Sequence, residues 1–221
     1  MSFGGYSVTT GRGNLFEQSF PIVMEGLLSG PLSLLGIQLE VRNAGQGGVS
    51  SMPYGWCIRN FLGSDADVVS WDFRFNEGSD SASMEAFLRH SMTMPRSPKF
   101  ILMAKRSPTR KQVLRQYVSE GYITDSIVVN NAFPPESEFM KLDEKIRPPG
   151  FQNFEEYGAP PGSPGQDSYI PTKKWHEMMA WFLTIHMLDA ADLAFEMIAK
   201  TMRNESPQHT GLALPAPLND H

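Results

Sequence analysis

The chain has 221 residues and a mass of 24.7 kDa, which predicts one large domain or one domain with extensions. Its hydrophobic content of 41% is enough for a substantial core, and its net charge of −5 argues against a general nucleic-acid binder. The single cysteine, Cys57, excludes an internal disulfide and a multi-cysteine zinc site, and its Trp-Cys-Ile context predicts a buried side chain.

Neither a signal peptide nor a membrane span is recognisable in the sequence. The nearest apolar run, residues 23–39, is interrupted by Glu25, Pro31 and Gln38. As written, the chain is therefore predicted to be cytoplasmic. Met1 stands so close to the first glycines that little of a first strand remains, which indicates truncation at the N-terminus. A longer parent chain would be compatible with secretion or membrane anchoring.

The first residues form a short apolar start and then a turn of small residues with Ser7 at its centre. Gly5 lets the backbone turn sharply at the end of a strand, and Gly11 gives the next segment the same freedom. A serine at this point projects beyond the carboxyl end of the strand, where ligands bind in open α/β sheets. The ordinary alternative is a loop rich in Gly, Ser and Thr near a terminus.

Strand-like and helix-like segments alternate along the chain, which is typical of βαβ units. The pattern predicts a three-layer α/β/α sandwich with a mostly parallel sheet of about five strands, the short strand around Phe3 at its edge. Strands are expected near residues 3–5, 37–41, 67–73, 99–104 and 123–129. Helices are expected over residues 14–35, with a break near Gly30-Pro31, and over 51–62, 81–92, 109–120 and 174–203.

Residues 132–172 form a long loop rich in Pro and Gly, and loops of this length are either functional or disordered. Since this loop leads to the last helix, we expect it to form one wall of a cleft. Tyr157 or Tyr169 would then lie near an acyl or sugar pocket. We expect residues 1–203 to form one domain and residues 204–221 to form a flexible tail.

The sequence indicates neither a cofactor nor a metal. The glycine-rich segment 43–50 follows a predicted strand, but it lacks the pattern of a phosphate loop and the spacing of a dinucleotide fingerprint. The segment 176–180 begins His-Glu but lacks the second histidine of a His-Glu-x-x-His zinc motif.

Three successive strand ends carry Ser7, Gly48 and Asn76, and His176 opens the last helix. The carboxyl ends of parallel strands share one edge, so we expect these residues to converge there. The set fits acyl transfer, because a serine nucleophile needs a base and histidine is that base near neutral pH. The oxyanion donors would be the Ser7 and Gly48 N–H groups and the Asn76 amide. Ordinary alternatives are a helix cap for Asn76 and a buried, hydrogen-bonded structural role for His176.

These blocks resemble the SGNH hydrolases, the GDSL-like lipase and esterase superfamily, over most of residues 3–200. Gly5-Tyr6-Ser7 with Gly11 is similar to the family's Gly-Asp-Ser block, and residues 43–50 are similar to the block that supplies the oxyanion glycine. Residues 74–77 and Trp175-His176 are similar to the Asn block and the His block. Segments 43–56 and 65–77 look most like SGNH-type proteins of algae and other microbial eukaryotes.

The resemblance implies a flavodoxin-like sandwich and a serine esterase that forms an acyl-enzyme on Ser7, with His176 as base. Its substrates would be small acyl esters or glycan esters, including acetyl groups on carbohydrate. Three positions depart from the family: Tyr6 replaces an aspartate, Arg74 replaces a glycine, and Lys173 stands where the family has the acid three residues before the histidine. Asp167 is the candidate for that acid. Lys173 is expected to lower the pKa of the His176 imidazole.

Two other functions remain as alternatives. One is a catalytically impaired SGNH-like module that binds glycans or a partner through the same cleft, which Lys173 and Arg74 favour. The other is an acyltransferase, because a sugar hydroxyl can intercept the same acyl-enzyme in place of water. The sequence does not specify the acyl group, the alcohol or the oligomeric state.

Overall fold

The computed structural model describes residues 1–221 apart from 74–75, 78–80, 104–107, 123–124, 128–172 and 204–221. The strands of this part of the chain are β1 (Ser2–Gly5), β2 (Arg42–Asn43), β3 (Val68–Asp72), β4 (Lys99–Met103) and β5 (Asp125–Ile127). Its helices are α1 (Ser7–Thr10), the 3-10 helix η1 (Phe16–Gln18), α2 (Phe20–Leu34), α3 (Ser51–Trp56), α4 (Ile58–Leu62), α5 (Ala82–Met92), α6 (Pro108–Ser119) and α7 (Lys173–Arg203).

The strands form one sheet in the order β2-β1-β3-β4-β5, and every neighbouring pair is parallel. This confirms the predicted parallel sheet of about five strands. The prediction that the strand around Phe3 lies at an edge is wrong. β1 lies between β2 and β3, with Ser2 paired to Arg42 on one side and Gly5 paired to Asp72 on the other. β2 pairs with one side of β1, and β3, the next strand in the chain, pairs with its other side. The first strand is therefore interior.

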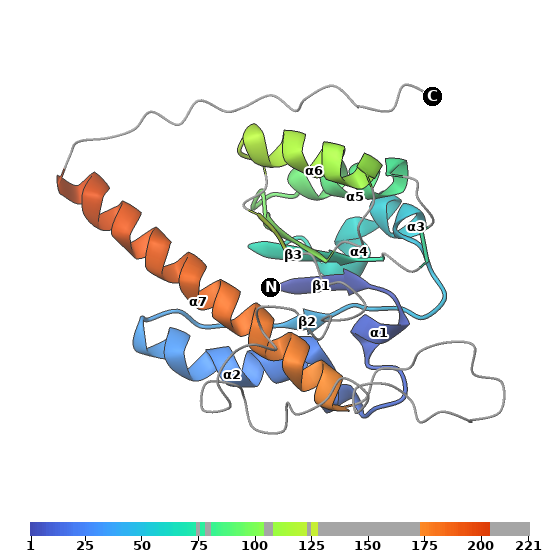
Figure 1. The fold of residues 1–221 in the computed structure, drawn as a ribbon, viewed down its shortest axis with the longest axis horizontal. Coiled ribbons are helices and arrows are strands. Elements are labelled where there is room, and N and C mark those ends of the chain that lie inside the picture. The colour runs from blue at the N-terminus through green and yellow to red at the C-terminus, as the bar shows by residue number, and fades with distance from the viewer. Residues whose placement is uncertain (74–75, 78–80, 104–107, 123–124, 128–172, 204–221) are drawn as a thin grey trace.

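Helices cover both faces of the sheet, as Figure 1 shows, with α2 and α7 on one side and α3 to α6 on the other. β4 illustrates how the sequence builds these layers, because its side chains alternate between the two faces. Phe100 and Leu102 pack with the core under α3 to α6, whereas Ile101 and Met103 pack with the core under α2 and α7. The predicted three-layer α/β/α sandwich is therefore confirmed.

Several element boundaries differ from the predictions. The strand expected over residues 37–41 is instead Arg42–Asn43, because the ladder with β1 starts where the Arg42 N–H donates to the Met1 carbonyl. The helix expected over residues 14–35 begins only at Phe20 and continues through Gly30-Pro31 to Leu34. Cys57, predicted to be buried, is exposed, because the helix expected over 51–62 is broken there into α3 and α4.

Among the described residues, one helical stretch, Lys173–Met202, is long and apolar enough to cross a membrane by length and composition alone. The sequence pattern predicts this stretch only as a packed helix. Its first half belongs to the core of the sandwich, where Trp175, Met179 and Leu183 are buried. Core helices of this kind are often as long and apolar, so this finding is weak evidence for a span.

The Gly5 turn depends on the missing side chain at that position. A Cβ at Gly5 would lie 2.0 Å from the Thr9 Oγ1 atom and 2.6 Å from the Thr9 Cβ atom. Thr9 is β-branched and hydrogen-bonded, so it cannot move aside cheaply. We expect Gly5→Ala to lower the free energy of unfolding by about 2–3 kcal/mol, as overpacking does, measured by urea denaturation.

Gly26→Ala is the matched control for this substitution. Gly26 is exposed inside α2, and a Cβ there would meet no atom within 4 Å. Because alanine favours a helix more than glycine does, Gly26→Ala should raise the free energy of unfolding by about 0.5–1 kcal/mol. Equal effects of the two substitutions would contradict the tight-turn interpretation.

Candidate active site

Ser7 is the first residue of α1 and lies directly beyond the end of β1. Because β1 lies between β2 and β3, the loops that follow all three strands gather around it. The Gln46 N–H donates to the Gly5 carbonyl at 2.9 Å, and a Cβ at Gly47 would lie 3.7 Å from the Ser7 Cβ atom. The Ser7 side chain is half-buried. The glycine-rich segment thus lies against the serine turn, as the sequence predicted.

A buried aspartate fixes the turn that carries Ser7. Asp72 ends β3 with no exposed surface, and its Oδ2 atom accepts a hydrogen bond of 2.8 Å from the Thr9 hydroxyl. The Asp72 carbonyl accepts a second one, of 3.1 Å, from the Tyr6 N–H. Both residue 6 and residue 9 of the turn are therefore attached to the neighbouring strand. Asp72 and Thr9 were not among the predicted site residues. An acidic residue at the end of a predicted buried strand is nevertheless a sequence pattern that could have indicated Asp72.

The loop after β2 is attached to the same turn. The Asn43 side-chain amide donates to the Thr9 carbonyl at 2.8 Å and to the Ser19 hydroxyl at 3.1 Å. A Cβ at Gly45 would lie 2.7 Å from the Thr10 nitrogen, so only glycine allows this close approach. These contacts hold the loop after β2 beside α1.

Gly48 and Asn76 lie in the loops on either side of the serine turn. Gly48 has φ +76°, a left-handed conformation that favours glycine, and open space surrounds the place where its Cβ would be. Asn76 is exposed, and its Nδ2 atom donates to the Val49 carbonyl at 2.7 Å. That bond uses one of the two N–H groups of the amide. α5 begins at Ala82 after Ser81, so Asn76 does not occupy its cap position.

Glu77 joins the loop after β3 to α3. Its Oε1 atom accepts hydrogen bonds from the backbone N–H and the hydroxyl of Ser51, the first residue of α3. Glu77 is 6% exposed, so this carboxylate is a buried structural group near a helix N-terminus. The contacts described so far bring the loops of Ser7, Gly48 and Asn76 together at the carboxyl edge of the sheet.

His176 lies in a different environment. Its side chain has no exposed surface, and its Nδ1 atom accepts a hydrogen bond of 3.2 Å from the Phe20 N–H, at the start of α2. The imidazole stacks on the Phe20 ring, with centroids 6.0 Å apart, and meets the Trp175 ring edge-on. Within the described residues, no hydrogen bond joins His176 to Ser7.

The protonation of His176 follows from this environment. Burial lowers the pKa of the His176 imidazole to about 4, so the ring is neutral at pH 7. Because Nδ1 accepts a hydrogen bond, the proton of the neutral ring is on Nε2. An imidazole in this tautomer cannot accept a proton at Nε2, so its present role is to hold α7 against the start of α2.

The expected direction of the His176 pKa shift was correct, but its expected cause was wrong. Burial is the cause of the lowered pKa, and no charged group in the described part of the chain, Lys173 included, contributes to it. The Lys173 ammonium is exposed and lies 3.5 Å from the Glu177 carboxylate. Asp167, Arg74, Tyr157 and Tyr169 fall outside the described residues, so the acid and the pocket residues stay predictions.

Comparisons with known proteins place the fold. No protein-family model matches the chain, and no curated protein matches it either. The chain is similar to the crystal structure of a two-domain esterase, CEX, active on acetylated mannans, with a TM-score of 0.60 and 16% identity over 99% of this chain and 53% of that one. A structure of such an esterase with mannopentaose gives a TM-score of 0.58 at 16% identity, over 99% and 52% of the two chains.

A further similar structure is a protein from Desulfitobacterium hafniense DCB-2 described as lipolytic and of the G-D-S-L family, with a TM-score of 0.51 and 15% identity. It is matched over 83% of this chain and 97% of that one. The chain spans about half the length of the two-domain esterase. The protein thus has the SGNH/GDSL hydrolase-like fold that the sequence motifs indicated, and the solved structures that it resembles are described as an esterase and as a lipolytic protein.

The hydrogen bond between Thr9 and Asp72 can be tested by an isosteric substitution. Thr9→Val removes the hydroxyl and deprives the buried carboxylate of one donor. We expect a loss of about 2 kcal/mol in the free energy of unfolding, as for hydrogen bonds to charged groups. Thr10→Val is the control, because the Thr10 hydroxyl makes only a long, 3.3 Å bond to the Tyr6 carbonyl. Similar losses in the two variants would contradict the special role of Thr9.

The buried His176 should make stability depend on pH. The unfolded chain binds a proton near the ordinary histidine pKa of 6.5 and the folded chain only near 4, so the free energy of unfolding falls as the pH drops between these values. The full effect is about 3 kcal/mol. His176→Gln retains an acceptor for the Phe20 N–H but does not titrate. Denaturation curves of both proteins from pH 7 to 4 measure the difference, and parallel profiles would show that His176 is not the source.

Proposed function

We propose that the protein is a serine ester hydrolase that acts on acyl esters, with acetyl esters of carbohydrate as the favoured class, and that Ser7 carries the acyl group. The observation that supports this most is the placement of Ser7 beyond an interior strand, between the glycine-rich loop and the Asn76 loop. The esterase neighbours support the reaction class, and the activity of one of them on acetylated mannans supports the substrate class.

In the proposed reaction, the Ser7 Oγ atom attacks the ester carbonyl carbon while a base takes the hydroxyl proton. The bond from that carbon to the alcohol oxygen breaks, and the alcohol leaves with the proton. Water then adds to the acyl-enzyme, the bond to Oγ breaks, and the free acid leaves as Ser7 regains a proton. Each step passes through a tetrahedral oxyanion. The Ser7 N–H, the Gly48 N–H and the second N–H of the Asn76 amide are the proposed donors to it.

The proposed reaction requires a general base that can take the proton of the Ser7 hydroxyl. His176 can act on Ser7 only if its bond from the Phe20 N–H breaks, the ring becomes accessible and the proton leaves Nε2. We therefore propose that His176 serves as base only after a rearrangement at the start of α7, with Asp167 as the acid that orients it. Without that rearrangement its role is structural.

The second candidate function is an SGNH-like module that binds carbohydrate esters through the same loops without turnover. The burial of His176 favours it, since a serine without a base is a weak nucleophile. The exposed Lys173, at the place of the expected acid, favours it too. Both candidates place the ligand at the Ser7 edge and differ only in chemistry.

Labelling with a fluorophosphonate probe, together with hydrolysis of 4-nitrophenyl acetate and acetylated mannan, tests the proposal. We expect the wild type to be labelled and Ser7→Ala to be unlabelled and inactive. Ser33→Ala, an exposed serine of α2, is the control that should keep both label and activity. A loss of 10²-fold or more in kcat/KM for His176→Gln, with the fold intact, would assign the base, because general-base catalysis contributes roughly that factor.

The other outcomes decide between the candidates. Label on Ser7 with full activity in His176→Gln would support the hydrolase and remove His176 from the mechanism. No Ser7-dependent label and no hydrolysis would overturn the hydrolase. Binding of an acetylated manno-oligosaccharide, measured by calorimetry and weakened in Asn76→Ala, would then establish the binding module.

A further inference from the structure

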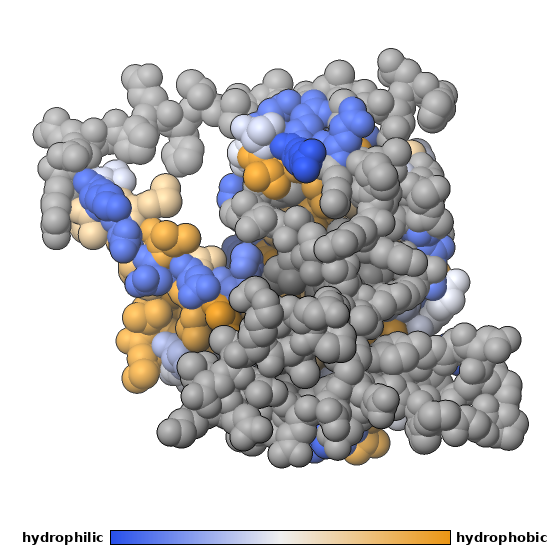
Figure 2. Space-filling model, viewed as in Figure 1, coloured by the Kyte–Doolittle hydropathy of each residue, from blue (hydrophilic) through white to orange (hydrophobic). Residues whose placement is uncertain are grey.

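Trp56 is a large aromatic side chain that the fold leaves in solvent. It is the last residue of α3, and 72% of it is exposed. Figure 2 shows apolar side chains gathered along α7, whereas α3 lies at the opposite side of the same view, as Figure 1 shows. A single exposed apolar residue is common on protein surfaces and does not indicate a binding site by itself. The contacts and the surroundings of Trp56 distinguish it from such a residue.

Two neighbours fix the orientation of the Trp56 ring. The indole N–H donates to the Met52 Sδ atom at 3.2 Å, one turn earlier in α3. The ring also contacts the His90 imidazole of α5, with centroids 5.5 Å apart. Gly55 brings α3 close to α5 at this point, because a Cβ there would lie only 3.4 Å from the Phe87 Cα atom. The ring is therefore already oriented before a ligand binds, which lowers the entropic cost of binding.

A hollow of about 330 Å³ lies beside this ring, between α4 and the end of α5. Its polar lining includes Arg59, Asn60 and His90. The Arg59 Nη2 atom donates to the Thr93 carbonyl at 2.9 Å, which leaves further N–H groups of the guanidinium available. Within the described part of the chain, neither the Asn60 amide nor the His90 ring forms a hydrogen bond. The hollow thus offers donors and acceptors next to an exposed aromatic face.

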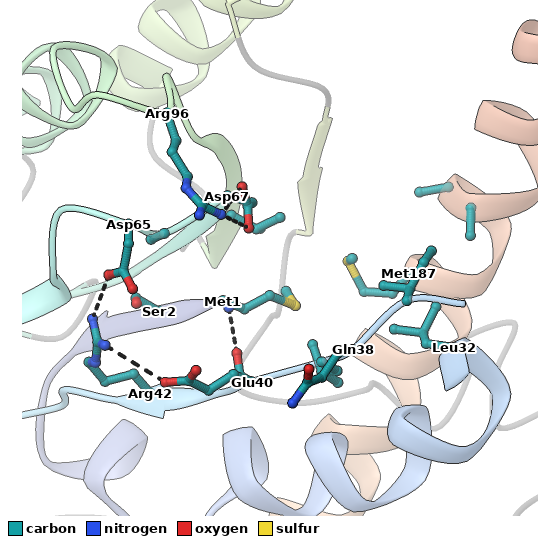
Figure 3. A pocket seen from close by; sticks show the side chains of 16 residues that line it. Met1, Ser2, Leu32, Gln38, Glu40, Arg42, Asp65, Asp67, Arg96 and Met187 are labelled. Carbon is teal, nitrogen blue, oxygen red and sulfur yellow. Dashed lines mark hydrogen bonds and ion pairs between the residues drawn. The ribbon is translucent and has the colours of Figure 1, made fainter. Parts of the chain in front are cut away.

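A larger hollow, at the amino edge of the sheet, differs in this respect. It has a volume of about 530 Å³, and Figure 3 shows that its charged side chains pair with one another. Arg42 lies 3.4 Å from Asp65, and Arg96 lies 2.9 Å from Asp67. A polar ligand would have to compete with these ion pairs, whereas the hollow beside Trp56 requires no such exchange.

α3 connects the hollow beside Trp56 with the edge of the sheet that carries Ser7. Ser51, the first residue of α3, donates hydrogen bonds to Glu77, which follows Asn76 in the loop after β3. Trp56 is five residues further along, about 7.5 Å of helix rise. A polymer that binds at the Ser7 edge is therefore long enough to reach the indole.

We propose that Trp56 is the platform of a second carbohydrate subsite, in which one pyranose ring of a neutral polysaccharide lies on the exposed face of the indole. The C–H groups on a pyranose face carry partial positive charge, and the face of an aromatic ring is negative. The sugar hydroxyls then form hydrogen bonds with Arg59, Asn60 and His90. The carbohydrate class rests on the proposed function, but the subsite takes no part in the chemistry at Ser7.

A protein partner and a nucleic acid fit this hollow less well than a sugar. At the centre of a protein interface, a tryptophan is surrounded by further desolvated contact area. Here polar side chains surround it instead. Nucleic-acid bases also stack on aromatic rings, but their phosphates require a basic surface, and this chain has a net charge of −5. A neutral sugar needs neither.

Calorimetry with mannopentaose tests the proposal on the full chain carrying Ser7→Ala, because this background allows binding without turnover. We expect Trp56→Ala to weaken binding about 3- to 10-fold, the range of one aromatic stacking contact. Trp56→Phe keeps a ring and should weaken binding less. Phe195→Ala, the matched control, removes another exposed ring, on α7, and should leave the affinity unchanged. Urea denaturation of each variant checks that the fold is intact.

Oxidation by N-bromosuccinimide tests where the sugar lies. Trp71 and Trp175 are buried and Trp181 is half-buried, so Trp56 is the indole that the reagent reaches first. Mannopentaose should slow the oxidation of Trp56, measured by mass spectrometry of its peptide. Sorbitol at the same concentration has no pyranose face and should not slow it.

Three results would overturn the proposal. The first is binding of mannopentaose that Trp56→Ala retains in full, which would place the sugar at the Ser7 edge alone. The second is no binding of mannopentaose or acetylated mannan. The third is an oligomer that Trp56→Ala dissociates, which would assign the ring to a protein interface. Sugar binding that depends on Trp56 in a protein without esterase activity would keep the subsite and remove only the hydrolase.

Discussion

The hydrogen bond between the Thr9 hydroxyl and the Asp72 carboxylate is the contact on which the candidate site depends. It joins the helix that carries Ser7 to the end of the neighbouring strand, in a region where both partners are fully buried. Gly5 must lack a side chain for Thr9 to reach this position, and Asn43 attaches the same turn to the loop after β2. Ser7, the proposed nucleophile, is thus positioned by residues on or beside the ends of β1, β2 and β3.

His176 shows how one residue type can satisfy a motif and still belong to the core. A histidine at the start of the last helix fits the expected position of a base, yet its ring fills the space between Phe20 and Trp175. Its Nδ1 atom satisfies a backbone N–H at the first turn of α2, a group that has no partner inside its own helix. Burial then makes the neutral ring the stable form, which suits packing and opposes proton transfer.

The sequence predicted the features that local patterns determine. Period-two and period-3.6 alternation located β3, β4, α5, α6 and α7 closely, and glycines at strand ends located the loops around Ser7. Features set by distant partners were not predictable in this way. The interior position of β1 depends on which side β2 pairs, the exposure of Cys57 depends on a break between two helices, and the role of Asp72 depends on a threonine 63 residues away.

Two parts of α7 lie near opposite edges of the sheet. Its first turn holds the start of α2 through His176, whereas Ala190 and Ala191 line one hollow together with Met1, Ser2 and Val68, at the amino edge of the sheet. The loops of Ser7, Gly48 and Asn76 meet at the other, carboxyl edge of the sheet, so the first turn of α7 is the part of this helix that lies nearer to them.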